Sequence, residues 1–512
     1  MAAVLIALAV PNAAAPQFGN LVVDTTADGN DGECNNDCTL REAIALGDSS
    51  TGQWVSIRPG VYRLTLGPIT LGNDIVFGVS FTGSSSSGAR TTVIDARGAG
   101  RAFDVPSGVS AVLAGVTVTG GGASVANGGQ LNLYGAILRG NATAGRGGAV
   151  LNGGSLAVFN STLTGNSAGA GGAIANEPGA NAAVYTSTIS GNSGGGITTA
   201  GSLQMQRATI AGNTGGGLVQ ESVDGANTAM WSSLLSGNAG GDCAGSVAGI
   251  PRSLTVRNID SDGSCLWASP DQGSTGDARL GALANNGGAT DTHAILTGSP
   301  AINNGDPNFC GGGNDQREAP AVGNCDIGSY EFGGRVPVVQ LPPPVPGETV
   351  NVNLSRGIVK VKLPGSDEFF DLKDAQQVPM GTTFDTSKGR VNLVAAGSQK
   401  SWFYQGVFKI AQTRGAKPQT TLTLTGKLSC GRGSGASAAQ KKNKKRRLWG
   451  DGKGKFRTKG KHSAATVVGT RWLVEDRCNG TLTRVTRGKV RVRAGKKTIV
   501  LRAGQKYFAR AK

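Results

Sequence analysis

The sequence is poor in aromatic residues, which make up only 5% of its 512 residues. Glycine, in contrast, occurs 83 times, roughly twice its average usage. This composition argues against one conventional core filled with leucine and phenylalanine. Glycine and proline together stay below the level that indicates disorder, and apolar residues recur regularly between the glycines. We therefore expect a repetitive fold with tight turns, divided into two or three domains.

Histidine is almost absent, which disfavours two kinds of catalytic or metal site. The sequence contains only His293, in a turn-rich segment, and His462, in a basic loop. A nucleophilic triad needs a histidine in a suitable context. A zinc site needs two close Cys/His pairs, and Cys34 and Cys38 have no second pair nearby.

Long apolar runs are missing beyond the N-terminus. Residues 1–15, MAAVLIALAVPNAAA, join an apolar run to small residues without a basic n-region. This pattern favours a secretory signal cleaved near residues 13–15 over a buried apolar N-terminus. No later stretch approaches the roughly 18 apolar residues that a membrane span needs. We expect an exported protein without a transmembrane segment.

The eight cysteines support export because they fall into near-neighbour pairs. Eight cysteines allow 105 pairings in principle, and short loops favour one of them. The predicted disulfides are Cys34–Cys38, Cys243–Cys265, Cys310–Cys325 and Cys430–Cys478.

Five segments between residues 131 and 238 align with one another and end in Gly-Asn. They are LNLYGAILRGN, LAVFNSTLTGN, AAVYTSTISGN, LQMQRATIAGN and TAMWSSLLSGN, at steps of 25, 26, 21 and 25 residues. Each unit holds short alternating strands and a glycine cluster, and cannot bury its apolar side chains alone. The repeat predicts a right-handed parallel β-helix of the pectin-lyase-like type, with glycines at its corners.

The asparagines that end the repeats would form a column in such a stack. We interpret this column as a structural amide ladder, with a row of ligands as the alternative. Its members are Asn141, Asn166, Asn192, Asn213 and Asn238.

The open N-terminal end of the stack needs a cap. The segment TLREAIALG at 39–47 predicts a short helix, in which Thr39 and Glu42 have capping-box spacing. Leu40, Ala43, Ile44 and Leu46 would give this helix an apolar face against the first coil.

An acidic loop precedes this helix. Its oxygens suffice for calcium, although their spacing is not that of an EF-hand. The calcium candidates are Asp24, Asp28, Asp31 and Glu33. The alternative is a solvated loop tied by Cys34 and Cys38, and no other cofactor is expected.

Carboxylates are nearly absent from the middle of the stack, which disfavours a polysaccharide hydrolase or lyase. Between Val105 and Gln220 the sequence has one acidic residue, Glu177, whereas hydrolysis requires two facing carboxylates. Asp95, Asp104, Asp224 and Asp242 occur only at the ends of the stack. Catalysis by these end residues is kept as the alternative function.

Charge divides the chain into two modules. Residues 1–350 hold 14 basic and 25 acidic side chains, whereas residues 351–512 hold 36 basic and 8 acidic side chains. The formal net charge of the whole chain is +17. The segment GGRVPVVQLPPPVPGE at 333–348 separates them and should be an extended spacer. The Val490 and Val492 side chains alternate with cations, so one strand face should be apolar and the other cationic.

The cations of the second module are candidates for binding an anionic polymer. They are Lys444, Lys445, Arg446, Arg447, Lys489, Arg491 and Arg493. Trp449 and Phe456 are available for stacking, but export makes nucleic acid an unsuitable target, and cell-wall anions fit better. A purely solubilising loop at 441–461 is the alternative.

Several segments resemble families of bacterial secreted proteins. CTLREAI at 38–44 resembles the CSLREA domain, and residues 280–305 and 315–332 are similar to the choice-of-anchor Q domain, with departures at Asn303 and Glu318. The GGAV and GGAI clusters resemble the repeats of polymorphic outer-membrane proteins. Residues 350–365, 378–396 and 469–507 look like the strand units of FecR-type domains. These resemblances imply a surface location and no reaction.

Together, these features predict an all-β protein with a signal at 1–15, an N-terminal cap and first coils at 20–110, and β-helix repeats at 111–245. A C-terminal cap at 246–332 and the spacer would precede a basic β-rich domain at 349–512. We expect a secreted, non-enzymatic, adhesin-like or structural protein of the bacterial surface. Its β-helix would contact glycans, and the basic module would hold it to anionic envelope polymers.

Overall fold

The computed structural model describes residues 21–35, 37–48, 54–72, 74–79, 88–97, 100–221, 228–246, 255–267, 269–310, 313–337, 341–366, 368–373, 375–430, 445–467 and 470–511. The predicted signal segment lies outside these residues, as do Asp224 and Lys444. Within them, no helix has the length and apolar character needed to cross a lipid bilayer.

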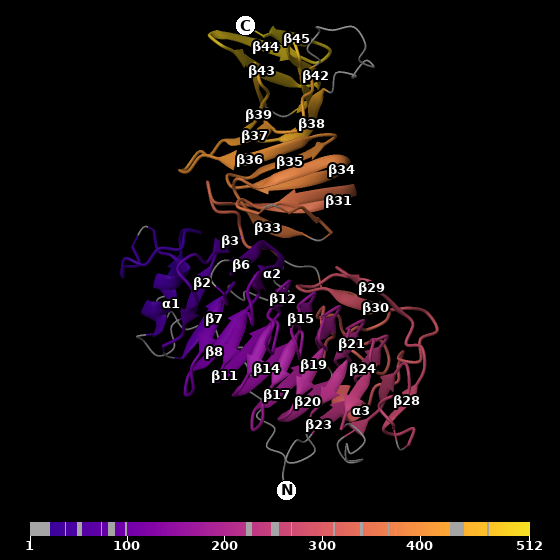
Figure 1. Cartoon of the computed structure of the whole chain (residues 1–512). Coiled ribbons are helices and arrows are strands. Elements are labelled where there is room, and N and C mark those ends of the chain that lie inside the picture. The colour runs from indigo at the N-terminus through magenta and orange to yellow at the C-terminus, as the bar shows by residue number, and fades with distance from the viewer. Residues whose placement is uncertain are drawn as a thin grey trace, which may run out of the picture.

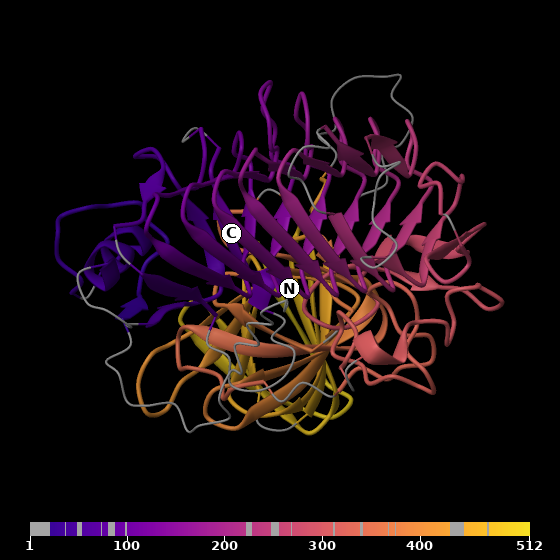
Figure 2. The same cartoon turned by 90° about the horizontal axis from the view of Figure 1, so that it is seen from below.

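The first module is a parallel β-helix, which confirms the predicted fold class. Its strands form three parallel sheets, and successive coils follow one another along one axis (Figures 1 and 2). Sheet A comprises β1 (Leu21–Val23), β2 (Trp54–Ile57), β5 (Ile75–Gly78), β8 (Ser110–Ala114), β11 (Gln130–Tyr134), β14 (Ser155–Phe159), β17 (Asn181–Tyr185), β20 (Ser202–Gln206), β23 (Thr228–Trp231) and β26 (Thr255–Val256). Sheet B comprises β3 (Gly60–Arg63), β6 (Thr92–Asp95), β9 (Thr117–Thr119), β12 (Ile137–Arg139), β15 (Thr162–Thr164), β18 (Thr188–Ser190), β21 (Thr209–Ala211), β24 (Leu234–Ser236), β27 (Asn258–Asp260) and β28 (Gly273–Thr275). Sheet C comprises β4 (Ile69–Thr70), β7 (Phe103–Val105), β10 (Val125–Asn127), β13 (Val150–Asn152), β16 (Ile174–Asn176), β19 (Ile197–Thr199), β22 (Leu218–Gln220) and β25 (Cys243–Gly245).

The Gly-Asn motif forms the corner that follows sheet B. Its glycine adopts a left-handed conformation, as at Gly191 with a φ of 65°, which costs glycine little because it has no Cβ. The asparagine that follows is buried inside the stack, as Asn192 is. Glycine at this position therefore turns the chain, and asparagine connects one coil to the next.

The helix α1 (Leu40–Asp48) covers the first coil, as the sequence predicts. Leu40, Ala43 and Ile44 are buried in the same apolar core as the first strands. The capping box is also confirmed: the backbone N–H of Thr39 donates to Oε2 of Glu42 at 2.9 Å, and that of Glu42 donates to Oγ1 of Thr39 at 3.2 Å.

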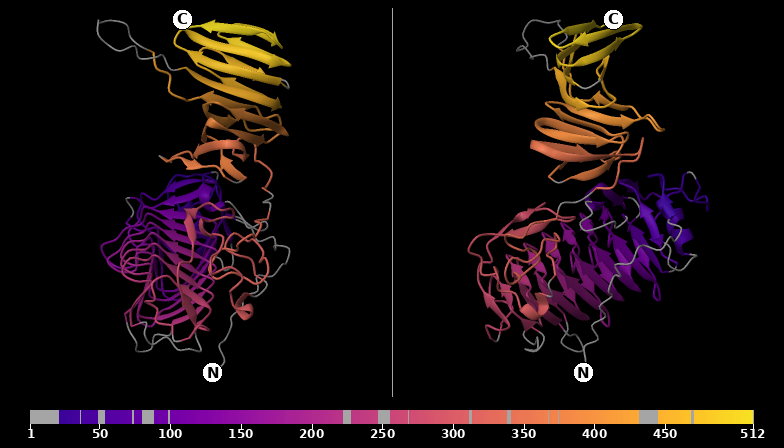
Figure 3. Two further views of the ribbon diagram at one scale, coloured as in Figure 1. Left: turned by 90° about the vertical axis from the view of Figure 1, so that its right-hand side faces the viewer. Right: turned by 180° about the vertical axis from the view of Figure 1, so that it is seen from behind.

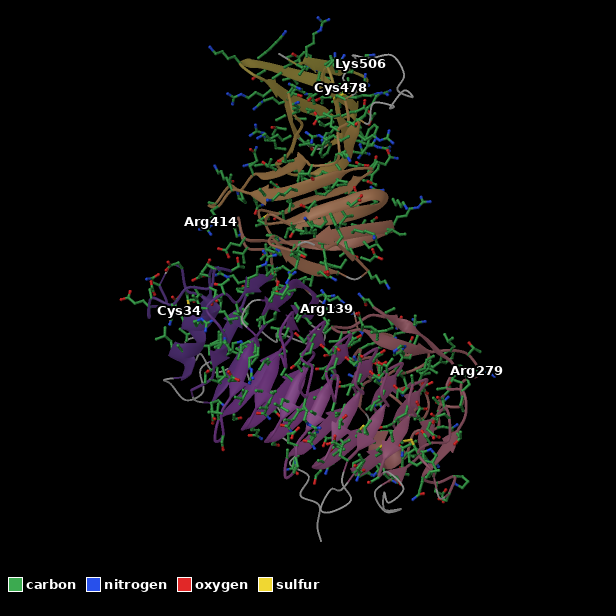
Figure 4. The ribbon with its side chains drawn as sticks, viewed as in Figure 1. Cys34, Arg139, Arg279, Arg414, Cys478 and Lys506 are labelled. Carbon is green, nitrogen blue, oxygen red and sulfur yellow. A yellow bond between two sulfur atoms is a disulfide. The ribbon has the colours of Figure 1, made fainter. Side chains whose placement is uncertain are left out.

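The four predicted disulfides are all present, and the described residues contain no free cysteine. Figure 4 shows Cys34 near the N-terminal end of the β-helix and Cys478 in the distant part of the C-terminal module.

The segment after β28 packs against the outside of the stack. It contains the hairpin β29 (Leu280–Ala284) and β30 (Thr292–Ile295) and the short helix α3 (Pro307–Cys310). This segment, residues 278–332, returns along the outer face of sheet B and reaches α2 (Gly88–Thr91), where Arg90 contacts Gly288 and Asp291. We name it the returning segment.

The second module is a separate, β-rich domain with its own apolar core. Its strands are β31 (Thr349–Lys362), β32 (Phe370–Asp371), β33 (Gln376–Pro379), β34 (Thr383–Ala395), β35 (Gln399–Tyr404), β36 (Val407–Gln412), β37 (Thr420–Leu424), β38 (Arg446–Lys453), β39 (Phe456–Lys459), β40 (Ala464–Val467), β41 (Thr470–Arg477), β42 (Gly480–Arg487), β43 (Lys489–Ala494), β44 (Lys497–Arg502) and β45 (Lys506–Arg510).

The sheet of this domain divides at β34, which pairs with both β35 and β36. One branch, here the first branch, runs β36-β37-β39-β40-β43-β44, and the second runs β35-β38-β41-β42-β45. The two branches face each other across the core, where Nε1 of Trp472 donates to Oγ1 of Thr458 at 3.0 Å. Figure 3 shows these strands following one another away from the β-helix.

The domain rests on the first coils of the β-helix instead of being held away by an extended spacer. Arg58 lies 3.2 Å from Glu348, and Arg63 donates to the carbonyl oxygen of Gly365 at 2.5 Å. Val61 of β3 is buried within the core of the C-terminal domain.

Candidate functional site

The asparagine column after sheet B is a structural ladder. Each Nδ2 donates to Oδ1 of the asparagine one coil further on, at 2.8–2.9 Å, from Asn141 to Asn238. Each also donates to a carbonyl oxygen of the preceding coil, as Asn166 does to Leu138 at 3.0 Å. The amide hydrogens are therefore used inside the stack, and the structural interpretation is confirmed.

A second ladder, which the sequence analysis missed, lies at the end of sheet C. Asn127 donates to Asn152 at 2.6 Å, Asn152 to Asn176 at 2.7 Å, and Asn176 to Oγ1 of Thr199 at 3.0 Å. These residues recur at steps of 25, 24 and 23. This regular spacing in the sequence could have predicted the second ladder. Both polar columns of the interior are thus satisfied without a ligand.

The four calcium candidates do not converge on one point. Asp28 pairs with Arg41 at 3.0 Å and Asp24 with Arg58 at 2.8 Å, while Asp31 accepts the backbone N–H of Glu33. In the described part of the chain, no group of three histidine, cysteine or acidic side chains could hold a metal ion. The loop therefore does not fit calcium.

Asp28 acts as a structural anchor for this loop. Its side chain is 4% exposed and accepts the backbone N–H of Leu66 at 2.8 Å. Burial opposes its ionisation, but Arg41 and the backbone donors outweigh this effect and lower the pKa of Asp28.

The acidic residues at the ends of the stack have structural partners. Asp95 is buried and lies 2.7 Å from Nη2 of Arg97. Asp104 pairs with Arg101 at 2.9 Å. Asp242 is fully buried and accepts from Asn238.

One shallow hollow nevertheless brings two carboxylates to a common surface. It has a volume of about 340 Å³ on the outer face of sheet C, and Asp104 and Glu177 both line it. Glu177 lies 2.7 Å from Arg146, which also pairs with Glu221 at 2.7 Å. Each carboxylate of the hollow is thus neutralised by an arginine.

His293 fastens the returning segment to sheet B. One ring nitrogen lies 2.8 Å from Oγ of Ser190 and the other lies 2.7 Å from the carbonyl oxygen of Gly281. Burial lowers the pKa of His293. The other histidine, His462, donates its backbone N–H to Thr481. Among the described residues, neither imidazole is paired with a carboxylate as a catalytic triad requires.

A buried charge cluster lies beneath the returning segment. Arg317 pairs with Asp315 at 2.6 Å, and Arg207 of the β-helix lies 3.6 Å from Glu331. Burial raises the pKa of Glu331 and of Asp326 beside it. These side chains are almost completely buried, so they connect the segment to the stack and do not face a ligand. In the sequence, the charged residues of DQREAP at 315–320 and SYEF at 329–332 could have indicated this buried cluster.

The outer face of sheet A carries no charge from β8 to β23. Its strands read SAVLA, QLNLY, SLAVF, NAAVY, SLQMQ and TAMW. Tyr134, Phe159 and Tyr185 occupy the same register on three neighbouring strands, and their rings stack at centroid distances of 4.6 and 5.0 Å. This face therefore combines half-buried aromatic rings with exposed amides such as Gln130 and Gln204.

The predicted basic cluster at 444–447 is only partly available to a ligand. Arg446 pairs with the buried Asp476 at 2.8 Å, so it has a structural role. Lys445 and Arg447 are exposed.

The two aromatic residues near this cluster differ. Trp449 is half-buried on the outer face and stacks on Tyr404 at 6.2 Å. Phe456, expected to be available for stacking, is fully buried in the domain core, because β39 points it between the two branches.

Lys489, Arg491 and Arg493 are exposed on one face of β43, while Val490 and Val492 are buried, as the alternation predicts. Neighbouring strands of the first branch extend this set. We name as the cationic face the outward side chains of Lys409, Arg457, Lys459, Lys489, Arg491, Arg493 and Arg502. The strands of the first branch contain no acidic residue.

The ion pairs of the C-terminal domain lie elsewhere in the described residues. They join Lys360 to Asp371, Arg390 and Arg487 to Asp451, Arg446 to Asp476, and Arg477 to Glu475. The cationic face is therefore a surface whose charges have no partner within the described part of the chain.

No family model, characterised protein or solved structure matches the chain.

Proposed function

We propose that this is a secreted, non-enzymatic protein of the bacterial surface whose C-terminal domain binds an acidic polymer of the envelope. The cationic face is the observation that carries the proposal. Seven cations share it without an acidic residue on the same strands. Lys489 and Arg502 lie directly opposite each other on β43 and β44, where like charges are unfavourable, and an anionic polymer would supply the missing counter-charge.

The β-helix would provide a second, neutral contact surface. The uncharged face of sheet A offers the stack of Tyr134, Phe159 and Tyr185 beside exposed amides. Aromatic rings provide apolar contact area with defined geometry, and side-chain amides both donate and accept hydrogen bonds. This combination suits neutral glycans and supports an adhesin-like or structural role.

The four disulfides support a location outside the cytosol, because such bonds persist in oxidising compartments. Membership of the CSLREA, choice-of-anchor Q and FecR-like families is part of the same proposal. It rests on the motifs at 38–44 and 280–332 and on the strand units of the C-terminal domain.

Co-sedimentation of the full chain with purified bacterial envelopes tests the proposal. We expect binding at low ionic strength and release by about 0.5–1 M salt, where the Debye length falls to a few ångströms. Replacing Lys489, Arg491 and Arg493 by glutamine should abolish most of the binding.

A matched triple variant controls for net charge. Arg484, Lys506 and Arg510 are exposed on the second branch, and their replacement by glutamine removes the same charge from another face. Equal loss in both variants, or salt-resistant binding, would contradict the proposal.

A polysaccharide hydrolase or lyase is the second candidate, because Asp104 and Glu177 line one hollow. Asp104 on β7 and Glu177 after β16 are three strand steps apart, about 14 Å, so cleavage would need both side chains to reach toward each other to come within the roughly 5–10 Å of a catalytic carboxylate pair. New reducing ends or unsaturated products from a polysaccharide panel, lost in both Asp104→Asn and Glu177→Gln, would establish this function. A panel without turnover would leave the binding function.

A further inference from the structure

Apart from Arg502 on β44, the cations of the cationic face lie on the alternate strands β36, β39 and β43. The strand register defines one row across the sheet, which reads Arg493, Ala464, Lys459, Thr423, Lys409, Thr383 and Lys362 from β43 to β31. A cation therefore alternates with a small or hydroxyl side chain over seven successive strands. Phe369 lies beside the last cation, with Nζ of Lys362 5.8 Å from its ring centroid.

A second row, two residues along each strand, repeats the pattern. Arg491 on β43 and Arg457 on β39 are separated by Thr466 on β40, and Thr421 follows on β37. The alternating side chains between these rows point into the core, as Val492 and Leu422 do. Both rows consequently point outward on the same side of the sheet, the first extending from the first branch over β34 to β31.

The register sets the spacing of charge along each row. Adjacent strands lie about 4.8 Å apart, so cations on alternate strands repeat at about 9.6 Å. The first row thus spans about 29 Å from β31 to β43. A ligand lying across the strands would meet one cation at each such interval, with a threonine or alanine between.

We propose that the cationic face binds an extended acidic polysaccharide that carries one carboxylate per disaccharide. The disaccharide of an extended chain is close in length to the cation interval, so successive carboxylates would each meet a cation. The intervening neutral sugar would then lie over Thr423 or Thr383, whose hydroxyl groups can bond to its own. A polymer charged on every sugar would place half of its anions opposite uncharged side chains. This inference rests on the proposed function.

The test uses the full chain and polymers of defined charge spacing. Hyaluronan oligosaccharides carry one carboxylate per disaccharide, and polygalacturonate oligosaccharides carry one per sugar. At equal concentration of carboxylate and equal salt, we expect tighter binding of hyaluronan. Replacing Lys409 and Lys459 by threonine should weaken hyaluronan binding by about 30-fold, because each cation near an anionic surface contributes a factor of about five.

Two further variants separate spacing from total charge. Arg484→Thr with Lys506→Thr removes the same charge from the second branch and should change hyaluronan binding less than three-fold. Thr423→Lys adds a cation between two others, and should strengthen polygalacturonate binding about five-fold while leaving hyaluronan binding nearly unchanged.

The outcomes distinguish this inference from the proposed function. Binding of neither polymer would overturn the spacing inference, and the proposed function would fall only if co-sedimentation with envelopes also failed. Equal or tighter binding of polygalacturonate per carboxylate, with similar losses in the row variant and its control, would overturn the spacing inference and leave polyanion binding. Displacement of hyaluronan by double-stranded DNA at a lower charge concentration would overturn the assignment to polysaccharide.

Discussion

Asn238 donates its Nδ2–H to Oδ1 of Asp242 at 2.7 Å, and this bond ends the longer amide ladder of the β-helix. The backbone N–H of Asn238 donates to the same oxygen at 3.1 Å, while Oδ2 accepts from Oγ of Ser261 at 2.7 Å. A carboxylate only accepts hydrogen bonds. Asp242 therefore terminates the column without requiring another coil to accept a bond from it.

The first prediction concerns this terminus. In Asp242→Asn, one of the two oxygens becomes an amide donor that faces the donors of Asn238 or Ser261. A buried donor left without a partner costs about 1–3 kcal/mol, so the free energy of unfolding should fall by that amount. Urea denaturation followed by circular dichroism measures it.

Asn181→Ala is the matched control, because this asparagine is exposed at the start of β17. A surface substitution of this kind changes stability by no more than about 0.5 kcal/mol. Equal stability of the two variants would show that the Asp242 carboxylate does not terminate the ladder as described.

The sequence was sufficient to predict the stack, because the residues that repeat with its period, glycine and asparagine, each have a local structural role. Glycine at the corner and asparagine after it recur in five successive coils, so the ladder from Asn141 to Asn238 could be predicted. The path of the returning segment over the β-helix could not be predicted from the sequence, because hydrogen bonds to sheet B determine it. Thr188, for example, contacts Gln316 at 2.6 Å across 128 residues, and no local pattern encodes such a pairing.

The second prediction is that acid loosens α1 before the returning segment. Burial opposes the ionisation of Glu42, but the N–H groups of Thr39 and Asp31, both at 2.9 Å, outweigh it and lower the pKa. A carboxyl with a lowered pKa stabilises the fold above its unfolded pKa, near 4.3, and this contribution is lost as the pH falls through the folded pKa. The carboxyls of Glu331 and Asp326 have raised pKa values, so acid does not remove stabilisation there.

Hydrogen exchange between pH 7 and pH 3, corrected for intrinsic rates, measures this difference. Protection of α1 should decrease below about pH 4.3, while protection of residues 313–332 persists. Glu42→Gln should lower the protection of α1 at pH 7 and remove most of its pH dependence. Simultaneous loss of both regions in the native chain would contradict the prediction.

The third prediction ranks two disulfides. Cys243–Cys265 closes a loop with a sequence separation of 22, and Cys34–Cys38 one of 4. A disulfide stabilises mainly by restricting the unfolded chain, typically by about 2–4 kcal/mol and more for a longer loop. Replacing Cys243 and Cys265 by serine should therefore cost about 1 kcal/mol more than replacing Cys34 and Cys38. Chemical denaturation of both double variants decides the order, and a larger loss for the short loop would reverse it.

The cationic face was only partly predictable from the sequence. The alternation within β43 identified Lys489, Arg491 and Arg493, because a single strand has a period of two. Lys409 is the only cation of β36, and Lys459 shares β39 only with Arg457, so only the register of the four strand pairings from β43 to β36 aligns them with Arg493. Phe456 was misassigned for a related reason: its sequence neighbours are basic, but β39 turns its side chain to the interior.

The last prediction compares two left-handed corners of a single coil. Thr186, after β17, has a φ of 45°, and Gly191, after β18, has a φ of 65°. A left-handed conformation costs a residue with a Cβ about 1–2 kcal/mol, and part of this is offset when glycine replaces it, because glycine loses more entropy on folding. Thr186→Gly should thus stabilise the protein by about 0.5 kcal/mol, as Gly115 and Gly135 occupy the same corner in earlier coils.

Gly191→Ala should destabilise it by about 1 kcal/mol or more, although a Cβ there would lie 3.9 Å from Oγ1 of Thr164 and meet no steric clash. Opposite shifts of the urea midpoint are expected for the two variants, and shifts of the same sign would show that side-chain contacts, not backbone conformation, decide the residue at these corners.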